Sequence, residues 1–173
     1  KSKIQRAIDE HGIRVAVIDY LHLCDLEVKK NGGDEPAIAN HCKEMKTMAK
    51  ELKIAIIELA QFTKESKKDG LQPPNMSYLK GSSAIEQSAD AVILLWNPAK
   101  IDENFEWEGT AAKDKIAIIV AKNKNGRTGM FWHGVKAANN DFFELDDNDY
   151  EPNKHIEANF EFDNEEKPNI LTK

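Results

Sequence analysis

Two short apolar stretches of this sequence each end at a polar side chain that could do chemistry. Residues 14–18 (RVAVI) lead directly to Asp19, and residues 54–59 (IAIIEL) are soon followed by Gln61. Ligands of α/β proteins bind beside the carboxyl ends of the strands. An aspartate there can hold the Mg²⁺ that accompanies nucleotide phosphates, directly or through water. On this motif alone, Asp19 could equally be a cap or part of a turn.

Two stretches rich in cations could bind phosphate groups. The first is the long polar segment 62–78 and the residues after it, which carry Lys64, Lys67, Lys68, Lys80, Gly81 and Ser82. Such a segment is too long for a simple connection, and its lysines can follow a nucleic-acid backbone without reading sequence. A merely solvated loop explains the lysines at 64–68 about as well. The second stretch is a turn that contains Lys122, Lys124 and Arg127.

The spacing of apolar residues predicts the elements that position these groups. We expect helices over 1–11, 36–52 and 82–88, and strands over 14–18, 54–59 and 89–96. A run of β-branched and aliphatic residues such as 14–18 is typical of a strand buried on both faces of a sheet. Strands joined by a helix form a right-handed crossover, so the first two strands should run parallel. A helix that leads straight into a buried strand also suggests that a further segment precedes residue 1.

The carboxyl-terminal part of the sequence predicts a hairpin followed by an acidic tail. Strands at 115–121 and 128–135 flank an Asn-Gly turn, and 97–114 reads as a polar excursion. Residues 141–173 hold eleven acidic residues against three lysines, a net charge of −8, whereas residues 1–140 carry +2. We therefore expect a domain over 1–138 and a loosely packed or disordered tail over 139–173.

Composition limits the class of protein. At 173 residues, the chain can form one domain with a core. It holds no run of about 18 apolar residues and no signal-peptide core, so we expect a cytoplasmic protein without a membrane partner. Cys24 and Cys42 are too few for a disulfide framework or a zinc site. We expect Trp96, Trp107 and Trp132 to pack in the core or at its edge rather than to stack on bases.

Four stretches, taken in order, resemble the DnaB-like replicative helicases, hexameric motors whose ATPase domain has the RecA-like fold. Residues 17–23 (VIDYLHL) look like the Walker B strand, and residues 59–63 (LAQFT) match the strand whose glutamine senses the γ-phosphate. Residues 78–90 (YLKGSSAIEQSAD) resemble the loop that faces single-stranded DNA and the helix after it. Residues 120–129 (VAKNKNGRTG) are similar to the hairpin that reaches the neighbouring subunit's nucleotide. The resemblance extends over about residues 1–136.

The resemblance implies an α/β fold: part of a RecA-like P-loop NTPase, with a mostly parallel sheet flanked by helices and a carboxyl-terminal β-hairpin. It implies ATP and Mg²⁺ as cofactors, with Asp19 holding the metal. Gln61 would orient water, although a structural amide is the alternative. Cations of the turn would act on ATP in an adjacent subunit, an effect worth ~10³ to 10⁵ in rate. The implied partners are single-stranded DNA, identical subunits of a homo-hexamer, and a primase or helicase loader.

Two features of the sequence depart from that family. The phosphate loop (GxxxxGK[ST]) is absent, as is the segment with the catalytic glutamate. The sequence therefore lacks the groups that would hold the nucleotide phosphates beside Asp19. The strand that leads to that loop belongs between strands 54–59 and 89–96, and this chain should either close the gap or leave it for another segment. The usual Lys-x-Arg is also Lys122-Asn123-Lys124 here, and lysine lacks the bidentate fork of arginine. Arg127 could replace it, or could simply be exposed to solvent.

Two functional hypotheses follow. The chain is part of a replicative helicase that couples ATP hydrolysis to translocation on single-stranded DNA and duplex unwinding, and is by itself deficient in ATPase activity. Alternatively, it is a stand-alone, degenerate RecA-like module that binds single-stranded DNA through its lysines or a basic protein through its acidic tail, without catalysis. A RecA-like recombinase or clock-type ATPase fits the turn at 122–129 less well.

Overall fold

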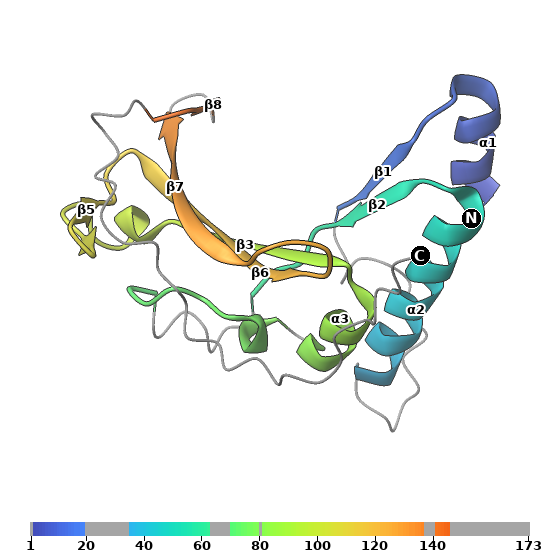
Figure 1. The fold of residues 1–173 in the computed structure, drawn as a ribbon, viewed down its shortest axis with the longest axis horizontal. Coiled ribbons are helices and arrows are strands. Elements are labelled where there is room, and N and C mark those ends of the chain that lie inside the picture. Colours follow the sequence, from blue (N-terminus) through green and yellow to red (C-terminus); the bar gives the residue numbers. More distant parts are fainter. Residues whose placement is uncertain (1, 20–34, 63–69, 80, 137–140, 146–173) are drawn as a thin grey trace, which may run out of the picture.

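The computed structural model describes residues 2–19, 35–62, 70–79, 81–136 and 141–145, which form two arms (Figure 1). One arm holds two helices and a pair of strands, and the other holds a four-stranded sheet. The elements are α1 (Ser2–His11), β1 (Val15–Ile18), α2 (Glu35–Leu52), β2 (Ala55–Glu58), η3 (Met76–Tyr78), α3 (Ser82–Ser88), β3 (Ala91–Trp96), η4 (Pro98–Lys100), β4 (Glu106–Trp107), β5 (Thr110–Ala111), β6 (Lys115–Asn123), β7 (Gly129–Lys136) and β8 (Asp141–Phe143). Among the described helices, none is long and apolar enough to cross a membrane.

The first two strands pair in parallel, as the crossover rule predicts. Ile18 lies opposite Glu58, so the two strands end side by side. The Glu58 carboxylate contacts the imidazole of His41 on α2, with 2.5 Å between Oε1 and Nε2. Helix α2 therefore covers this face of β2.

The opposite face of this strand pair is exposed, which corrects one prediction. Val15 and Val17 are 50% and 62% exposed, and Ile57 is 49% exposed. The prediction that the strand at 14–18 is buried on both faces is therefore wrong for this chain. An apolar run shows that a strand can be buried on both faces, but the chain must also supply a layer for each face, and the described residues supply one.

The second sheet is antiparallel, with strand order β3-β6-β7-β8. The hairpin of β6 and β7 and the helix at 82–88 form as predicted. In the described part of the chain, β2 pairs with β1 and β3 pairs with β6, and the two sheets are not joined. The gap expected between the strands at 54–59 and 89–96 thus stays open.

Aromatic residues form the centre of the larger core. Trp96 and Trp132 are 5% and 9% exposed, with ring centroids 5.8 Å apart. Phe105 and Trp107 meet Trp96 edge to face at 5.7 and 5.4 Å. All three tryptophans are therefore packing residues, as predicted.

Residues 97–114 contribute to this core, although the sequence presents them as a polar excursion. They include the short ribbon of β4 and β5, and Ala112 is completely buried. Strands of two residues are too short to show an alternating pattern. Their apolar side chains therefore gave no periodic signal.

The ordered sheet continues past the boundary predicted at 138. Strand β8 pairs with β7, with Phe142 opposite Val135 and Phe143 opposite Gly134. Residues 141–143, within the range 139–173 expected as a tail, thus form an edge of the sheet, while the domain boundary itself stays a prediction. Residues 146–173 lie outside the described residues, so their predicted disorder stays a prediction.

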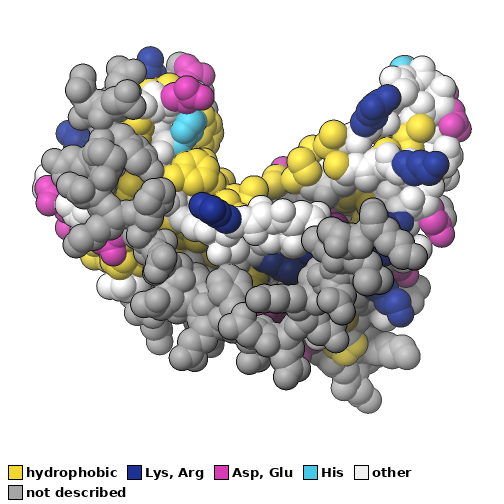
Figure 2. All heavy atoms as spheres, viewed as in Figure 1, with side chains coloured by type: hydrophobic (Ala, Val, Ile, Leu, Met, Phe, Trp, Pro, Cys, Tyr) yellow, Lys and Arg dark blue, Asp and Glu magenta, His cyan; other side chains and the backbone are white. Residues whose placement is uncertain are grey.

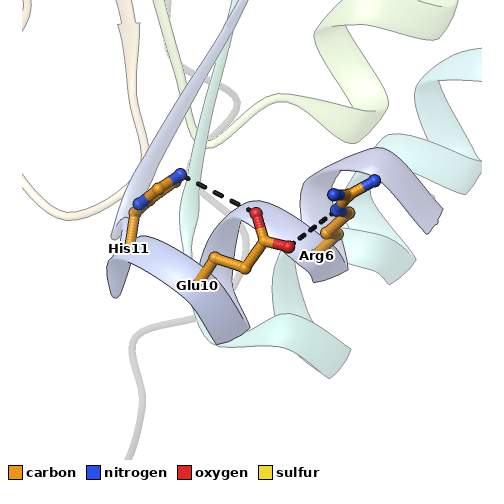
Figure 3. Close-up of polar contacts among 3 residues, drawn as sticks. All are labelled: Arg6, Glu10 and His11. Carbon is orange, nitrogen blue, oxygen red and sulfur yellow. Dashed lines mark hydrogen bonds and ion pairs between the residues drawn. The ribbon is translucent and has the colours of Figure 1, made fainter.

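Helix α1 turns a polar face to solvent. Figure 3 shows Arg6 and His11 on either side of Glu10, with 2.8 Å from Arg6 Nε to one carboxylate oxygen and 3.8 Å from His11 Nε2 to the other. The Arg6 and His11 side chains are 77% and 71% exposed. Exposed pairs of this kind contribute little to stability, so this cluster is a solvated surface rather than a site.

A smaller core joins α2 to α3. Ile38 is completely buried, and it packs with Cys42 and Ile85. Burial raises the pKa of the Cys42 thiol to about 11. Cys42 is a free thiol, and its burial makes it a packing residue, while Cys24 lies outside the described residues.

Candidate nucleotide and DNA interface

The structure brings together the ends of the two strands that carry Asp19 and Gln61. Asp19 follows β1 directly, and Gln61 comes three residues after the end of β2. Because β1 and β2 are parallel and in register at Ile18 and Glu58, both segments leave the same edge of this sheet. Both side chains are exposed there. Their positions agree with the predicted edge site, while their roles stay predictions.

Asp19 suits Mg²⁺ as one ligand among several. Its carboxylate is exposed, and no cluster of three or more potential ligand residues exists among the described His, Cys, Asp and Glu side chains. Mg²⁺ commonly takes only one or two carboxylates and completes its shell with phosphate oxygens and water. The donor set thus fits a metal that arrives with a nucleotide, not one held by protein alone.

A backbone bridge connects the Gln61 segment to the start of the predicted DNA loop. Phe62 forms an antiparallel bridge with Leu79, whose side chain is 6% exposed and belongs to the larger core. Gln61 is thus adjacent to one end of the bridge, and Gly81 lies two residues beyond the other. Four candidate DNA-contacting residues, Lys64, Lys67, Lys68 and Lys80, lie outside the described residues.

Gly81 has a structural reason to be glycine. It precedes α3 with φ of 74°, a left-handed conformation that favours glycine. A Cβ atom here would lie 2.7 Å from Cγ2 of Ile38, which is completely buried. Gly81 therefore allows α3 to pack closely on α2, whether or not it also contacts DNA. Ser82, the other residue predicted here, is the first residue of α3.

The turn that carries Lys122, Lys124 and Arg127 follows β6 and lies beside α3. Strand β6 runs antiparallel to β3, with Asn123 opposite Ala91, so the turn lies beside the amino end of β3. The structure thus groups Asp19 with Gln61 and places the cations of the turn beside α3.

Asp90 attaches this turn to the rest of the protein. The backbone N–H of Lys124 donates to the carbonyl of Asp90 at 2.8 Å, and the Lys46 ammonium on α2 donates to its carboxylate. The hydrogen bond from the Lys46 ammonium lowers the pKa of the Asp90 carboxyl group, and the positive charges of Lys46, Lys124 and Lys122 lower it further. Asp90 therefore links α2, the start of β3 and the turn.

The three cations of the turn differ in their availability. The Lys122 ammonium donates a hydrogen bond to the backbone carbonyl of Glu86 on α3. Lys124 and Arg127 are exposed. A contact with another molecule would thus come more readily from Lys124 or Arg127 than from Lys122.

Sequence reasoning missed the polar contacts that connect these elements. Lys46 and Asp90 are 44 positions apart, and His41 and Glu58 are 17 apart. No local pattern pairs residues at such separations. Of these four residues, Asp90 lies within the stretch 78–90 on which the resemblance rests. That position was the one sequence signal that any of them has a structural role.

The fold defines a class of protein, the RecA-like helicase ATPase domains. The structure superposes on one solved ATPase domain with a TM-score of 0.71, 26% identity, and coverage of 83% of this chain and 49% of the other. A second solved structure, of a DnaB-like replicative helicase and its interactions with primase, gives a TM-score of 0.70 and 26% identity, covering 83% and 34%. The predicted fold class is thereby confirmed.

The chain belongs to the DnaB-like helicase C terminal domain family, whose model matches residues 1–143. It is 31% identical over 129 residues to the replicative DNA helicase DnaC of Bacillus subtilis, and 30% identical to DnaB of Geobacillus stearothermophilus. Each alignment covers 75% of this chain and 27% of the relative. The chain thus spans about a quarter of the length of these relatives.

Proposed function

We propose that this chain is the carboxyl-terminal half of a replicative helicase ATPase motor, in which it supplies part of an ATP site and a surface for single-stranded DNA. The observation that carries the proposal is the bridge between Phe62 and Leu79. It connects Gln61, at a strand end suited to a γ-phosphate, with the Gly81 segment suited to a nucleic-acid backbone. A change at either segment would be transmitted to the other through two backbones held in one core.

The proposed ATP site is incomplete in this chain. Asp19 would hold Mg²⁺ bound to the nucleotide, and Gln61 would orient water, but the backbone N–H groups and lysine of a phosphate loop are absent from the sequence. We expect no magnesium-dependent ATP binding at micromolar concentration and no ATPase activity from this chain alone. Calorimetric titration with ATP and Mg²⁺ tests this, and micromolar binding would contradict the proposal that the site is incomplete.

In the complete motor we propose that the turn acts on a neighbouring subunit. Lys124 and Arg127 are exposed on a turn beside the start of β3, so they suit a nucleotide held by another copy of the motor. Such an arrangement requires a ring of subunits, and the relatives' family suggests a homo-hexamer. One of the superposed helicases interacts with primase, which we propose as a partner of the complete protein.

The DNA surface can be tested directly. We expect a fluorescent oligonucleotide of single-stranded DNA to bind, with an affinity that falls as salt rises. Changing Lys64, Lys67, Lys68 and Lys80 together to glutamine should weaken binding by about tenfold or more and reduce the salt dependence. The matched control changes four exposed lysines elsewhere, Lys3, Lys50, Lys53 and Lys100, to glutamine and removes the same charge. Equal losses in both variants would show a nonspecific charge effect and contradict the assignment.

A further inference from the structure

The turn between β6 and β7 lies in a region with an excess of positive charge. Four cations and two acidic residues belong to the segments that meet there: Lys46, Lys122, Lys124, Arg127, Glu86 and Asp90. In Figure 2, dark blue Lys and Arg side chains lie on the surface between the two arms, where Figure 1 places this turn. The region therefore attracts anions.

Two of these cations are available to an anion. The Lys46 ammonium contacts the carboxylate of Asp90, and Lys122 donates to a backbone carbonyl of α3. Lys124 and Arg127 are exposed, and neither forms a salt bridge with any residue that the structure describes. Two exposed cations on one short turn suit a ligand with several negative charges.

The same chain contains a segment of the opposite charge. Residues 146–173, which we call the acidic segment, hold nine acidic residues and three lysines, a net charge of −6. They come after residues 1–143, which the family model matches. The acidic segment is therefore an addition of this chain to the part that it shares with the family, and its charge complements that of the turn.

Strand β8 directs the chain toward the turn. Strand β7 begins at Gly129, just after the turn, and β8 pairs with it in the antiparallel direction. The chain therefore runs back along the sheet when it leaves β8, and Leu145 packs against the larger core. Phe143 lies opposite Gly134, which is seven residues from Arg127, so at most about 24 Å of extended strand separate them.

The length of the acidic segment exceeds this separation. Its 28 residues can span up to about 95 Å when fully extended. A tether of this kind holds a binding partner at an effective concentration on the order of millimolar. A contact with the turn of the same chain is thus favoured over a contact with another molecule at micromolar concentration.

We propose that carboxylates of the acidic segment occupy the exposed cations of this turn, Lys124 and Arg127, in the place of phosphate groups. The occupied cations are then withheld from other polyanions until these displace the carboxylates. The contact itself does not depend on the proposed function. Only its consequence, that the segment withholds the cations from a nucleotide of a neighbouring subunit, rests on that function.

Cross-linking of the full chain by a carbodiimide, which joins carboxylates to amines in contact with them, tests the proposal. Mass spectrometry then identifies the joined residues in the monomer. We expect carboxylates of residues 146–173 joined to Lys124, with a yield roughly fivefold or more above that at three exposed lysines of other elements, Lys3, Lys50 and Lys100.

A substitution that keeps the amine of Lys124 separates charge attraction from mere proximity. Arg127→Gln removes one of the two exposed cations, so the yield at Lys124 should fall roughly threefold or more. Lys50→Gln is the matched control, because it removes one charge at an exposed position of α2. It should leave the yield at Lys124 unchanged. Both positions are exposed, so both variants should keep the fold.

A competing anion provides a second measurement. Inorganic tripolyphosphate should lower the yield at Lys124 by about half or more at a concentration where sodium chloride of equal ionic strength does not. Cross-links spread evenly over the exposed lysines, or found mainly in the candidate DNA-contacting lysines at 64–80, would overturn the proposal. So would cross-links found only in a dimer, or a yield that neither Arg127→Gln nor tripolyphosphate changes. None of these readouts uses ATP or DNA, so the proposed function can fail while the contact holds.

Discussion

Single residues in this protein matter mainly through contacts that the chain makes across long separations. His41 and Glu58 form the best example, because their side chains are only 10% and 21% exposed. Neither residue belongs to a motif. Their contact attaches α2 to β2 and so helps to fix the strand end from which the Gln61 segment departs.

We expect His41→Ala and Glu58→Ala each to lower the free energy of unfolding by about 1 to 3 kcal/mol, because each leaves a polar partner largely buried without its hydrogen bond. The double variant should cost less than the sum of the two single changes. Urea unfolding followed by circular dichroism measures all three. Strict additivity would show that the contact contributes nothing to stability.

At the scale of elements, close packing of α3 on α2 depends on Gly81. The left-handed φ of 74° and the contact with Ile38 act together at this position. Gly12 also has a positive φ, of 63°, but a Cβ atom there would meet nothing within 4 Å. Comparing alanine substitutions at the two glycines therefore distinguishes the cost of backbone strain from the cost of steric overlap.

Gly12→Ala should cost about 1 to 2 kcal/mol, the strain of an alanine in the left-handed region. Gly81→Ala should cost about 1 to 3 kcal/mol more than that, because Ile38 is buried and cannot move aside. Adding Ile38→Ala to Gly81→Ala should cost less than the two changes separately. Thermal unfolding of the four variants provides the comparison, and similar losses at both glycines would rule out the packing argument.

The contact of Lys46 with Asp90 joins α2 to β3 and should depend on pH. A carboxyl group with a lowered pKa in the folded state contributes stability above its unfolded pKa of about 3.9, and this contribution is lost as pH falls through the folded value. Asp90 is 59% exposed, so the contribution at pH 7 should be below about 1 kcal/mol.

Lys46→Met should therefore lower stability slightly at pH 7 and have no such effect once Asp90 is protonated in acid. Lys50→Met, at an exposed position on the same helix, is the control and should show no pH-dependent difference from the wild type. Unfolding free energies measured from about pH 2 to 7 test this. A difference that persists unchanged in acid would assign the loss to packing of the lysine stem.

At the scale of the whole molecule, Ile85 forms an apolar connection between the two arms, in addition to the contact of Lys46 with Asp90. This side chain packs against both the larger core and the smaller core of Ile38 and Cys42. The arms are built on separate sheets in the described part of the chain. Cooperative unfolding should thus depend on this position.

We expect Ile85→Ala to lower stability by about 1 to 3 kcal/mol and to make hydrogen exchange in α2 faster than in β6. Ile101→Ala, at an exposed site, should change stability by less than about 0.5 kcal/mol. Exchange measured by mass spectrometry compares the arms. Equal acceleration in α2 and β6 would show that the arms unfold as one unit regardless of Ile85.

The sequence by itself determined the longer elements and the family. Helices over 36–52 and 82–88, the parallel crossover and the hairpin follow from apolar periodicity and turn chemistry, which are local properties of the chain. The order of motifs led to the family that the match over residues 1–143 establishes.

Only the tertiary structure decided which faces and ends meet. It showed that Val15 and Val17 are exposed, that the turn with Lys124 lies beside the start of β3, and that Phe62 bridges to Leu79. The physical reason is that burial and proximity depend on partners distant in sequence. An apolar run indicates that a strand can be buried on both faces. Whether a second layer covers the strand depends on the assembled molecule.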